Sequence, residues 1–138
     1  MTDKNECFRS LMEAATAARA FAYSPYSGYR VGAALLGKSG KIYTGCNVEN
    51  AGYTPTNCAE RTAVFKAISE GERGFAAIAV AGGLQDGEDP DCTPCGVCRQ
   101  VLAEFCSPDM PVILGTPREL RVLTLGELLP LAFTKKNL

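Results

Sequence analysis

Apolar residues recur along the chain with two different periods, and these periods predict its helices and strands. From about Asn5 to Ala22 an apolar residue appears every three or four positions, and the pattern stops before Pro25, so we predict a helix there. Two further stripes with helical spacing lie at Cys58–Glu70 and Pro94–Cys106. A last helical turn or two is predicted at Leu125–Leu129.

Strands are predicted between these helices. Arg30–Leu36 and Lys41–Cys46 flank Lys38-Ser39-Gly40, a sequence typical of a hairpin turn. Phe75–Ala81 is almost entirely apolar, as a central strand buried on both faces would be. A loop is predicted at Gly82–Thr93, and two short strands follow, at Val112–Leu114 and Leu120–Leu123. The order of elements indicates an α/β domain with a mixed sheet, formed as a single domain by residues 1–138.

Composition and charge narrow the classes of function. Fourteen basic and fifteen acidic residues give a net charge of -1, which argues against nucleic-acid binding by phosphate attraction. No stretch approaches the roughly 18 apolar residues of a membrane span, and the first residues are too polar for a signal peptide. We therefore expect a cytoplasmic protein with no membrane partner. The sequence has no histidine, so any acid–base or metal chemistry must use carboxylates, thiolates, lysine, tyrosine or backbone groups.

Three of the seven cysteines stand at the starts of predicted helices. Cys58 opens the second helix, and Cys95 and Cys98 lie in the opening of the third. Two cysteines at this spacing, with a third at another helix start, suit a tetrahedral metal that prefers sulfur ligands. Helix N-termini favour the thiolate form, and Arg61 and Arg99 could offset the charge of three thiolates on Zn²⁺.

A site with three protein ligands keeps one coordination position for water. A catalytic zinc lowers the pKa of such a water to about 7. Glu60 lies two residues after Cys58 in the same turn, so it is the candidate that takes the proton of the water and passes it to a leaving group.

The same residues allow other interpretations. Asn57 and Glu60 have the spacing of a helix capping box, in which Glu60 would have no chemical role. Cys92 could complete a closed four-cysteine zinc site or an iron–sulfur ligand set. A redox pair of Cys95 and Cys98 is a third possibility, but it leaves Glu60 unexplained.

Five segments of the chain, in order, resemble the small homotetrameric zinc-dependent cytidine deaminases. They are Tyr26-Ser27-x-Tyr29-x-Val31-Gly32-Ala33-Ala34, Gly45-Cys46-Asn47-Val48-Glu49-Asn50, Cys58-Ala59-Glu60-Arg61-Thr62-Ala63, Pro94-Cys95-Gly96-x-Cys98-Arg99-Gln100 and Leu128-Leu129-Pro130-x-Ala132-Phe133. The resemblance covers almost the whole chain. It implies a three-layer α-β-α sandwich around a mixed five-stranded sheet, and hydrolysis of cytidine and deoxycytidine to uridine and deoxyuridine in pyrimidine salvage.

The resemblance also implies roles for individual residues. The ligands of one Zn²⁺ per chain would be Cys58, Cys95 and Cys98, with Glu60 as proton shuttle beside a zinc-bound hydroxide. Arg61 would hydrogen-bond the zinc thiolates. The substrate-binding positions would be Tyr29, Asn47, Glu49, Ala59 and Phe133.

Some positions reach beyond one subunit, and others also have simpler explanations. The resemblance implies that Phe133 contacts the base in a neighbouring subunit of a homotetramer, and that Tyr53 lies near a subunit junction. From its residue type alone, Phe133 would belong to the core. Glu49 and Asn47 offer the acceptor and the amide that two ribose hydroxyls require, although Asn47 could equally shape a turn and Glu49 be solvated.

Three rival functions are also compatible with the sequence. A deaminase of a cytosine-nucleoside antibiotic such as blasticidin S would share the cysteine motifs but differ in the sugar pocket, where Asn47 and Glu49 favour the salvage enzyme. A non-catalytic structural zinc module would have a closed four-cysteine site. A nucleic-acid editing deaminase would need a basic path for the strand, which the balanced charge does not offer.

Overall fold

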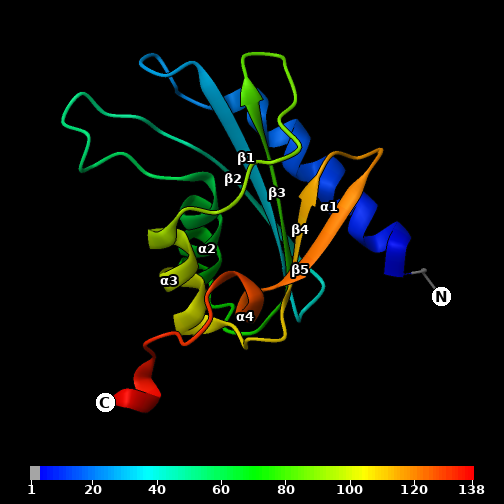
Figure 1. The fold of residues 1–138 in the computed structure, drawn as a ribbon, viewed down its shortest axis with the longest axis vertical. Coiled ribbons are helices and arrows are strands. Elements are labelled where there is room, and N and C mark those ends of the chain that lie inside the picture. The colour runs from blue at the N-terminus through cyan, green and yellow to red at the C-terminus, as the bar shows by residue number, and fades with distance from the viewer. Residues whose placement is uncertain (1–3) are drawn as a thin grey trace.

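A five-stranded sheet forms the middle layer of the molecule, and the computed structural model describes it within residues 4–138 (Figure 1). Its strands are β1 (Tyr29–Gly37), β2 (Ile42–Cys46), β3 (Phe75–Leu84), β4 (Pro111–Gly115) and β5 (Leu120–Thr124). They lie in the order β2-β1-β3-β4-β5. β3 and β4 are parallel and the other neighbouring strands are antiparallel, so the predicted mixed sheet is confirmed.

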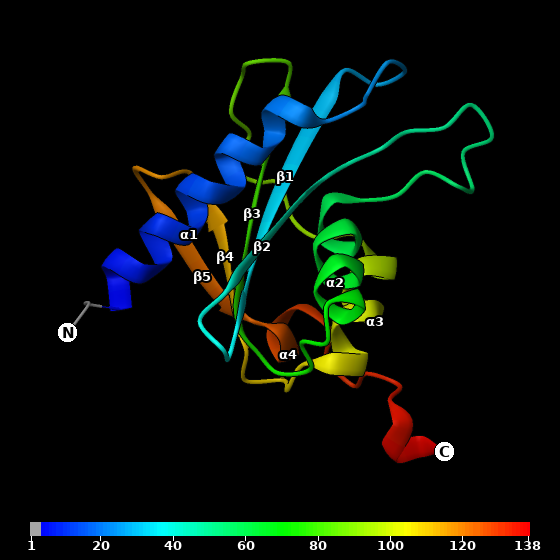
Figure 2. The same ribbon diagram turned by 180° about the vertical axis from the view of Figure 1, so that it is seen from behind.

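Helices cover both faces of this sheet. α1 (Lys4–Ala18) lies across one face, and α2 (Ala59–Ser69) and α3 (Gly96–Phe105) lie against the other (Figure 2). Short helices complete the chain: η1 (Arg19–Phe21), α4 (Leu125–Leu128) and η2 (Lys135–Asn137). The three-layer α-β-α arrangement that the resemblance implied is confirmed.

The two faces of the sheet have separate cores. Under α1, Leu11 and Met12 pack against small residues of β1 and β3. On the other face, Leu102 of α3 and Val64 of α2 belong to one cluster with the alternate residues of the strands. Gly32 of β1 allows the α1 face to close, because a Cβ there would lie 1.9 Å from the Ala15 carbonyl oxygen. Gly45 of β2 does the same for α2, where a Cβ would lie 2.6 Å from the Ala59 carbonyl oxygen.

The third strand is longer than the sequence pattern predicts. β3 continues through Gly82 and Gly83 to Leu84, where a loop was expected to begin at Gly82. Glycine weakens a strand in isolation, which is why these two residues suggested a loop. Here Gly82 and Gly83 pair with Val31 and Arg30 of β1, so the partner strand provides the order that the glycines themselves do not.

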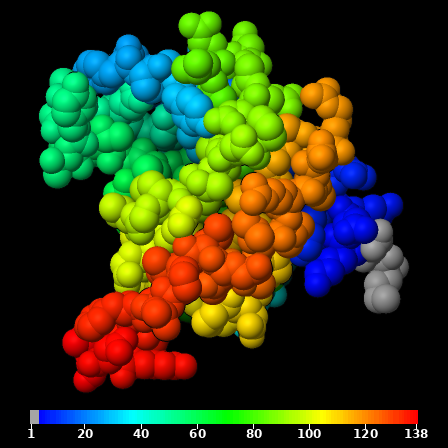
Figure 3. Space-filling model, in the orientation of Figure 1, coloured from blue at the N-terminus to red at the C-terminus, as the bar shows by residue number. Residues whose placement is uncertain are grey.

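The segment after α4 extends away from the three layers, and the loop between β2 and α2 forms a second projection (Figure 3). Phe133 and Leu131 in the first of these are largely exposed, as is Tyr53 in the second. Within residues 4–138 no helix has the length and apolar character needed to cross a bilayer.

Candidate active site

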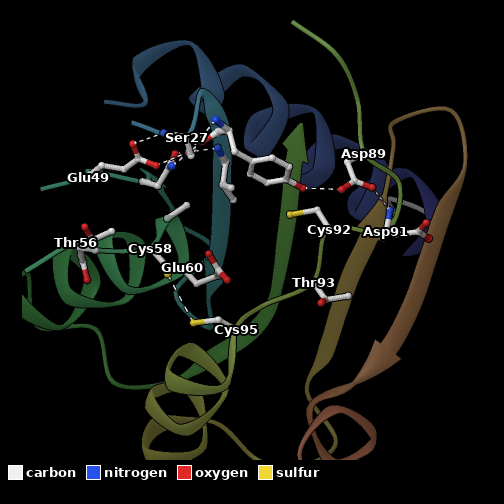
Figure 4. A pocket seen from close by; sticks show the side chains of 15 residues that line it. Ser27, Glu49, Thr56, Cys58, Glu60, Asp89, Asp91, Cys92, Thr93 and Cys95 are labelled. Carbon is white, nitrogen blue, oxygen red and sulfur yellow. Dashed lines mark hydrogen bonds between the residues drawn. The ribbon is translucent and has the colours of Figure 1, made fainter. Parts of the chain in front are cut away.

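A pocket of about 390 Å³ lies where α2 and α3 begin (Figure 4). Its walls come from the start of β1, the segment after β2, the first turn of α2 and the segment between β3 and α3. The lining residues are Ser27, Tyr29, Val31, Asn47, Glu49, Thr56, Asn57, Cys58, Ala59, Glu60, Asp89, Asp91, Cys92, Thr93 and Cys95. Most of the residues singled out from the sequence are therefore brought together in one cavity.

Three cysteine sulfurs meet at the base of this pocket. The Sγ atoms of Cys58, Cys95 and Cys98 all lie within 4.8 Å of one another, and those of Cys58 and Cys95 are 3.7 Å apart. Cys58 and Cys95 are the N-cap residues of α2 and α3, and neither makes a side-chain capping bond. Both sulfurs are thus left available at the positive ends of two helices.

The cluster fits a zinc ion. Ligand sulfurs about 2.3 Å from a tetrahedral zinc lie about 3.8 Å apart, close to the separation of Cys58 and Cys95. The thiol of Cys98, as a hydrogen-bond donor, and then the guanidinium of Arg61 lower the pKa of Cys58 to about 5. The site therefore favours the thiolate that a metal requires.

Arg61 faces the cluster from α2. Its Nη2 donates to the Sγ of Cys58 at 3.3 Å, while its buried Nε finds no hydrogen-bond partner within residues 4–138. Arg99 has a different environment: its Nε donates to the Pro94 carbonyl and its Nη1 to the Leu128 carbonyl, each at 2.8 Å. Arg61 is therefore the cation that contacts the sulfur cluster, while Arg99 connects the start of α3 to α4.

Glu60 lies beside the cluster and is almost completely buried, with 3% of its surface exposed. Burial raises the pKa of its carboxyl group to about 7, the range in which a carboxylate can both take and give a proton at neutral pH. The capping box with Asn57 does not form, since the Asn57 amide donates instead to the Thr62 hydroxyl. Glu60 is therefore not the cap of α2.

Cys92 lines the pocket but lies outside the sulfur cluster. Within residues 4–138 the group that could hold a metal contains only Cys58, Cys95 and Cys98. The closed four-cysteine interpretation is therefore wrong.

Glu49 and Ser27 form one side of the pocket (Figure 4). The Glu49 carboxylate accepts hydrogen bonds from the Ser27 hydroxyl and from the backbone N–H groups of Tyr26 and Ser27. The hydroxyl is the main cause of a pKa for Glu49 below its usual range. Glu49 is thus a fixed, ionised acceptor and not a freely solvated side chain.

Asn47 is buried beside Glu49 and connects its segment to β1. Its Nδ2 donates to the Tyr29 carbonyl at 2.8 Å, and its Oδ1 accepts from the Val31 N–H at 2.9 Å. One N–H and one lone pair of the amide remain for a ligand.

Tyr29 connects the side of the pocket formed by Ser27 and Asn47 to Asp89. The Tyr29 hydroxyl donates to Asp89 Oδ2 at 2.8 Å, and Asp89 Oδ1 accepts from the Asp91 N–H at 2.9 Å. The Tyr29 hydroxyl is also the main cause of a lowered pKa for Asp89. The resemblance implied that Tyr29 binds the substrate, but no sequence pattern gave a role to Ser27, Asp89 or Asp91. The closely spaced acidic residues after β3 were the sequence feature that could have indicated Asp89 and Asp91.

Phe133 is 60% exposed and does not line the pocket of its own chain. The expectation from residue type alone, that it belongs to the core, is wrong. Ala59, in contrast, is fully buried as the first residue of α2, and it lines the pocket.

A layered α/β fold with three cysteines at two helix starts and a buried carboxylate beside them defines a class of zinc-binding hydrolytic deaminases. Comparison with known proteins identifies the family within this class. The family model described as "Cytidine and deoxycytidylate deaminase zinc-binding region" matches residues 5–114. The chain belongs to this family, and the predictions of a deaminase and of a zinc cofactor are confirmed.

Individual relatives agree with the family. A cytidine deaminase of Sporosarcina psychrophila is 54% identical over 122 residues, 88% of this chain and 87% of the relative. One of Halalkalibacterium halodurans is 51% identical over 93% of this chain and 95% of its own length. A crystal structure of cytidine deaminase from Burkholderia pseudomallei superposes with a TM-score of 0.83 at 49% identity, over 96% of this chain and 100% of the other. A blasticidin-S deaminase of Bacillus cereus is more distant, at 33% identity over 78% of this chain and 79% of its own.

Proposed function

We propose that this chain hydrolyses cytidine and deoxycytidine to uridine and deoxyuridine with release of ammonia, as an enzyme of pyrimidine salvage. One observation carries the proposal: Glu60 is buried and shares a pocket with the sulfur cluster. The relatives with about half of their residues in common all bear the name cytidine deaminase, which supports the same substrate.

The metal would be held by Cys58, Cys95 and Cys98, with Arg61 stabilising the thiolate of Cys58. Bound there, zinc would supply the Lewis acidity that lowers the pKa of water to about 7. Three protein ligands leave room for that water.

Glu60 would move the protons of the reaction. Its carboxylate takes a proton from the attacking water and gives it to the ring nitrogen next to the amino-bearing carbon, while the water oxygen bonds to that carbon. Glu60 then takes the second proton of the added hydroxyl group and delivers it to the amino group. The carbon–nitrogen bond breaks, ammonia leaves and a carbonyl group remains. A carboxyl group with a pKa near 7 suits both transfers, and such a role contributes roughly 10²–10⁴-fold to a rate.

The ribose would lie against Glu49 and Asn47. Glu49 is held as an acceptor by Ser27, and Asn47 keeps one N–H free of its bonds to β1. Tyr29 and Ala59 line the space between this side and the sulfur cluster, where the nucleoside would pack.

We also propose a homotetramer in which subunits share active sites. The support is that Phe133 projects from its own chain with 60% of its surface exposed, and that Tyr53 is 78% exposed on the other projecting segment. A phenyl ring so placed can cover the base only in a neighbouring subunit. None of the seven cysteines, which all lie within residues 4–138, forms a disulfide, which supports a reducing compartment such as the cytoplasm.

The deciding experiment is Glu60→Gln, assayed by the fall in cytidine absorbance and by zinc content. We expect one zinc per chain and a loss of turnover of about 10³-fold or more, because glutamine cannot carry the proton. Glu104→Gln, an exposed carboxylate of α3, is the matched control and should retain full activity. Activity of Glu60→Gln within about tenfold of wild type would contradict the proposal. A parallel assay with blasticidin S tests the antibiotic-deaminase alternative.

Shared sites are tested by mixing two inactive variants. Glu60→Gln supplies an intact Phe133, and Phe133→Ala supplies an intact Glu60. Subunit exchange between them should restore activity at hybrid sites, together with a tetramer in sedimentation. Mixtures that exchange subunits but stay inactive would contradict shared sites.

A further inference from the structure

Arg19 is a buried arginine on the opposite side of the sheet from the helices that carry the sulfur cluster. It is the first residue of η1, directly after α1, and only 8% of its surface is exposed. Its guanidinium donates three hydrogen bonds, all to backbone carbonyls: Nε to Arg30 at 2.9 Å, and Nη2 to Gln85 at 3.0 Å and to Gly87 at 2.6 Å. Within residues 4–138 no carboxylate lies within 4.0 Å of it.

These three carbonyls belong to the backbone near Tyr29 and near Asp89, the two residues that form one wall of the pocket. Arg30 follows Tyr29 in β1, while Gln85 and Gly87 precede Asp89 in the segment after β3. Arg19 therefore joins the backbone next to Tyr29 to the backbone next to Asp89, whose side chains are themselves joined by a hydrogen bond of 2.8 Å. The planar guanidinium holds its donors in a fixed geometry, so it sets the separation of the two backbone segments.

The surrounding backbone is shaped to admit this arrangement. A Cβ at Gly83 would lie 2.9 Å from Arg19 Nη2 and 2.1 Å from the Gly87 carbonyl oxygen. A Cβ at Gly82 would lie 2.5 Å from Cys92 Sγ and 3.1 Å from Tyr29 Cε1. The two glycines at the end of β3 thus leave room for the arginine on one side and for the pocket wall on the other.

The other attachments of this segment are backbone hydrogen bonds and two ion pairs between exposed side chains, Arg30–Asp86 at 3.9 Å and Arg118–Glu88 at 3.6 Å, and exposed pairs of this kind contribute little. Asp89 N–H donates to the Gly82 carbonyl at 2.7 Å, and Gln85 N–H donates to the Gly28 carbonyl at 2.9 Å. Its own side chains are exposed at residues 84–88, so packing contributes little to its position. The guanidinium bonds are consequently a main constraint on where Asp89 stands.

We propose that Arg19 is a positioning residue for nucleoside binding, which acts through the Tyr29–Asp89 wall without contacting the substrate. This inference rests on the proposed function above. Without Arg19, Asp89 loses its fixed position and the Tyr29 side chain loses its hydrogen-bond partner. The cavity then has a mobile wall, which weakens binding more than it slows the chemistry at Glu60.

The test compares Arg19→Met and Arg19→Lys with Arg9→Met. Arg9 is the matched control, an arginine of α1 that also donates to a carbonyl, that of Pro117 at 3.0 Å, far from the pocket. For Arg19→Met we expect KM for cytidine to rise about tenfold, the size of effect that one strong hydrogen bond accounts for, with kcat within about threefold of wild type. Arg19→Lys, which keeps the charge, should recover part of the loss, and Arg9→Met should leave KM unchanged.

A double-mutant cycle distinguishes positioning from a general loss of stability. Tyr29→Phe removes the hydroxyl that Asp89 accepts, so Arg19→Lys and Tyr29→Phe should raise KM together by less than the product of their separate effects. Independent effects that multiply, or a lowered melting temperature with unchanged KM, would overturn the proposal. If Arg19→Met does not fold, Arg19→Lys carries the cycle.

One readout does not depend on activity. Amide hydrogen exchange at Asp89, whose N–H donates to Gly82, should be at least about tenfold faster in Arg19→Lys than in Arg9→Met. Equal exchange in the two variants would overturn the positioning role. A wild-type protein that is inactive on cytidine would contradict the proposed function instead and leave this exchange result standing.

Discussion

The Arg61 guanidinium donates a hydrogen bond of 3.3 Å to the Sγ of Cys58, and both residues belong to the start of the same helix. One turn of α2 thus supplies a metal ligand and the cation that stabilises it as a thiolate. Glu60, between them in sequence, is the buried carboxylate of the pocket. The proposed ligand Cys58, the proposed proton carrier Glu60 and Arg61 therefore all lie within four consecutive residues.

Arg61→Gln should weaken zinc binding, because the Cys58 thiolate then loses its nearest cation. Loss of a residue that supports a ligand typically costs about 10–100-fold in metal affinity, and we expect an effect in that range. Competition with a chromophoric chelator measures it. Arg73→Gln, which removes an exposed guanidinium bonded only to carbonyls, should bind zinc as wild type does. Equal zinc affinity in both variants would remove Arg61 from the metal site.

Two buried cysteines should respond differently to substitution. Cys98→Ala should abolish zinc binding, since its sulfur belongs to the cluster, whereas Cys92→Ala should retain one zinc per chain. Elemental analysis of the purified variants decides the matter. A Cys92→Ala protein that contains no zinc would show that Cys92 is a ligand.

Gly32→Ala should destabilise the fold strongly, because the new Cβ would lie 1.9 Å from the Ala15 carbonyl oxygen and would force α1 away from β1. Overpacking of this kind costs about 1–3 kcal/mol or more. Gly96→Ala is the matched control, since a Cβ there meets nothing within 4 Å. Urea unfolding of both variants should show a lower midpoint for Gly32→Ala only.

The stability of the protein should fall in acid partly through Glu49. Its pKa is lowered in the folded state, so the contribution of Glu49 is present above its unfolded pKa of about 4.3 and disappears as the pH falls through the lower folded value. Ser27→Ala removes the main cause of the shift, so the midpoint of unfolding should depend less on pH below about pH 4.3.

Urea titrations of Ser27→Ala at neutral and acid pH test this expectation. Ser69→Ala, whose hydroxyl donates only to the Lys66 carbonyl, should keep the acid dependence of wild type. Identical acid dependence in Ser27→Ala and wild type would contradict the role given to the Ser27–Glu49 pair.

The helices and the zinc site were predictable because they depend on local patterns. Apolar periodicity located α1, α2 and α3 to within a few residues, and the cysteines at two helix starts indicated a common site before the fold was known. The thiol of Cys58 and the carboxyl group of Glu60 indicate metal binding and proton transfer from residue type alone. Predicting such features requires little knowledge of contacts between distant segments.

Features that depend on pairing between distant segments were not predictable. Gly82 and Gly83 suggested a loop, and only their pairing with β1 makes them strand. The Tyr29–Asp89 bond joins residues 60 positions apart, and Arg19 meets Gly87 across 68 positions, so no local signal connects them. Residue type alone placed Phe133 in the core, but in a single chain its side chain is exposed.

The N-caps of α2 and α3 have a consequence for the folded chain without its ion. Cys58 and Cys95 stand 37 positions apart, and each uses the cap position for sulfur while leaving the helix start without a side-chain hydrogen bond. An ion bound by both would cross-link the two helices at their starts. Demetallated chains should therefore lose order first at residues 58–62 and 95–99.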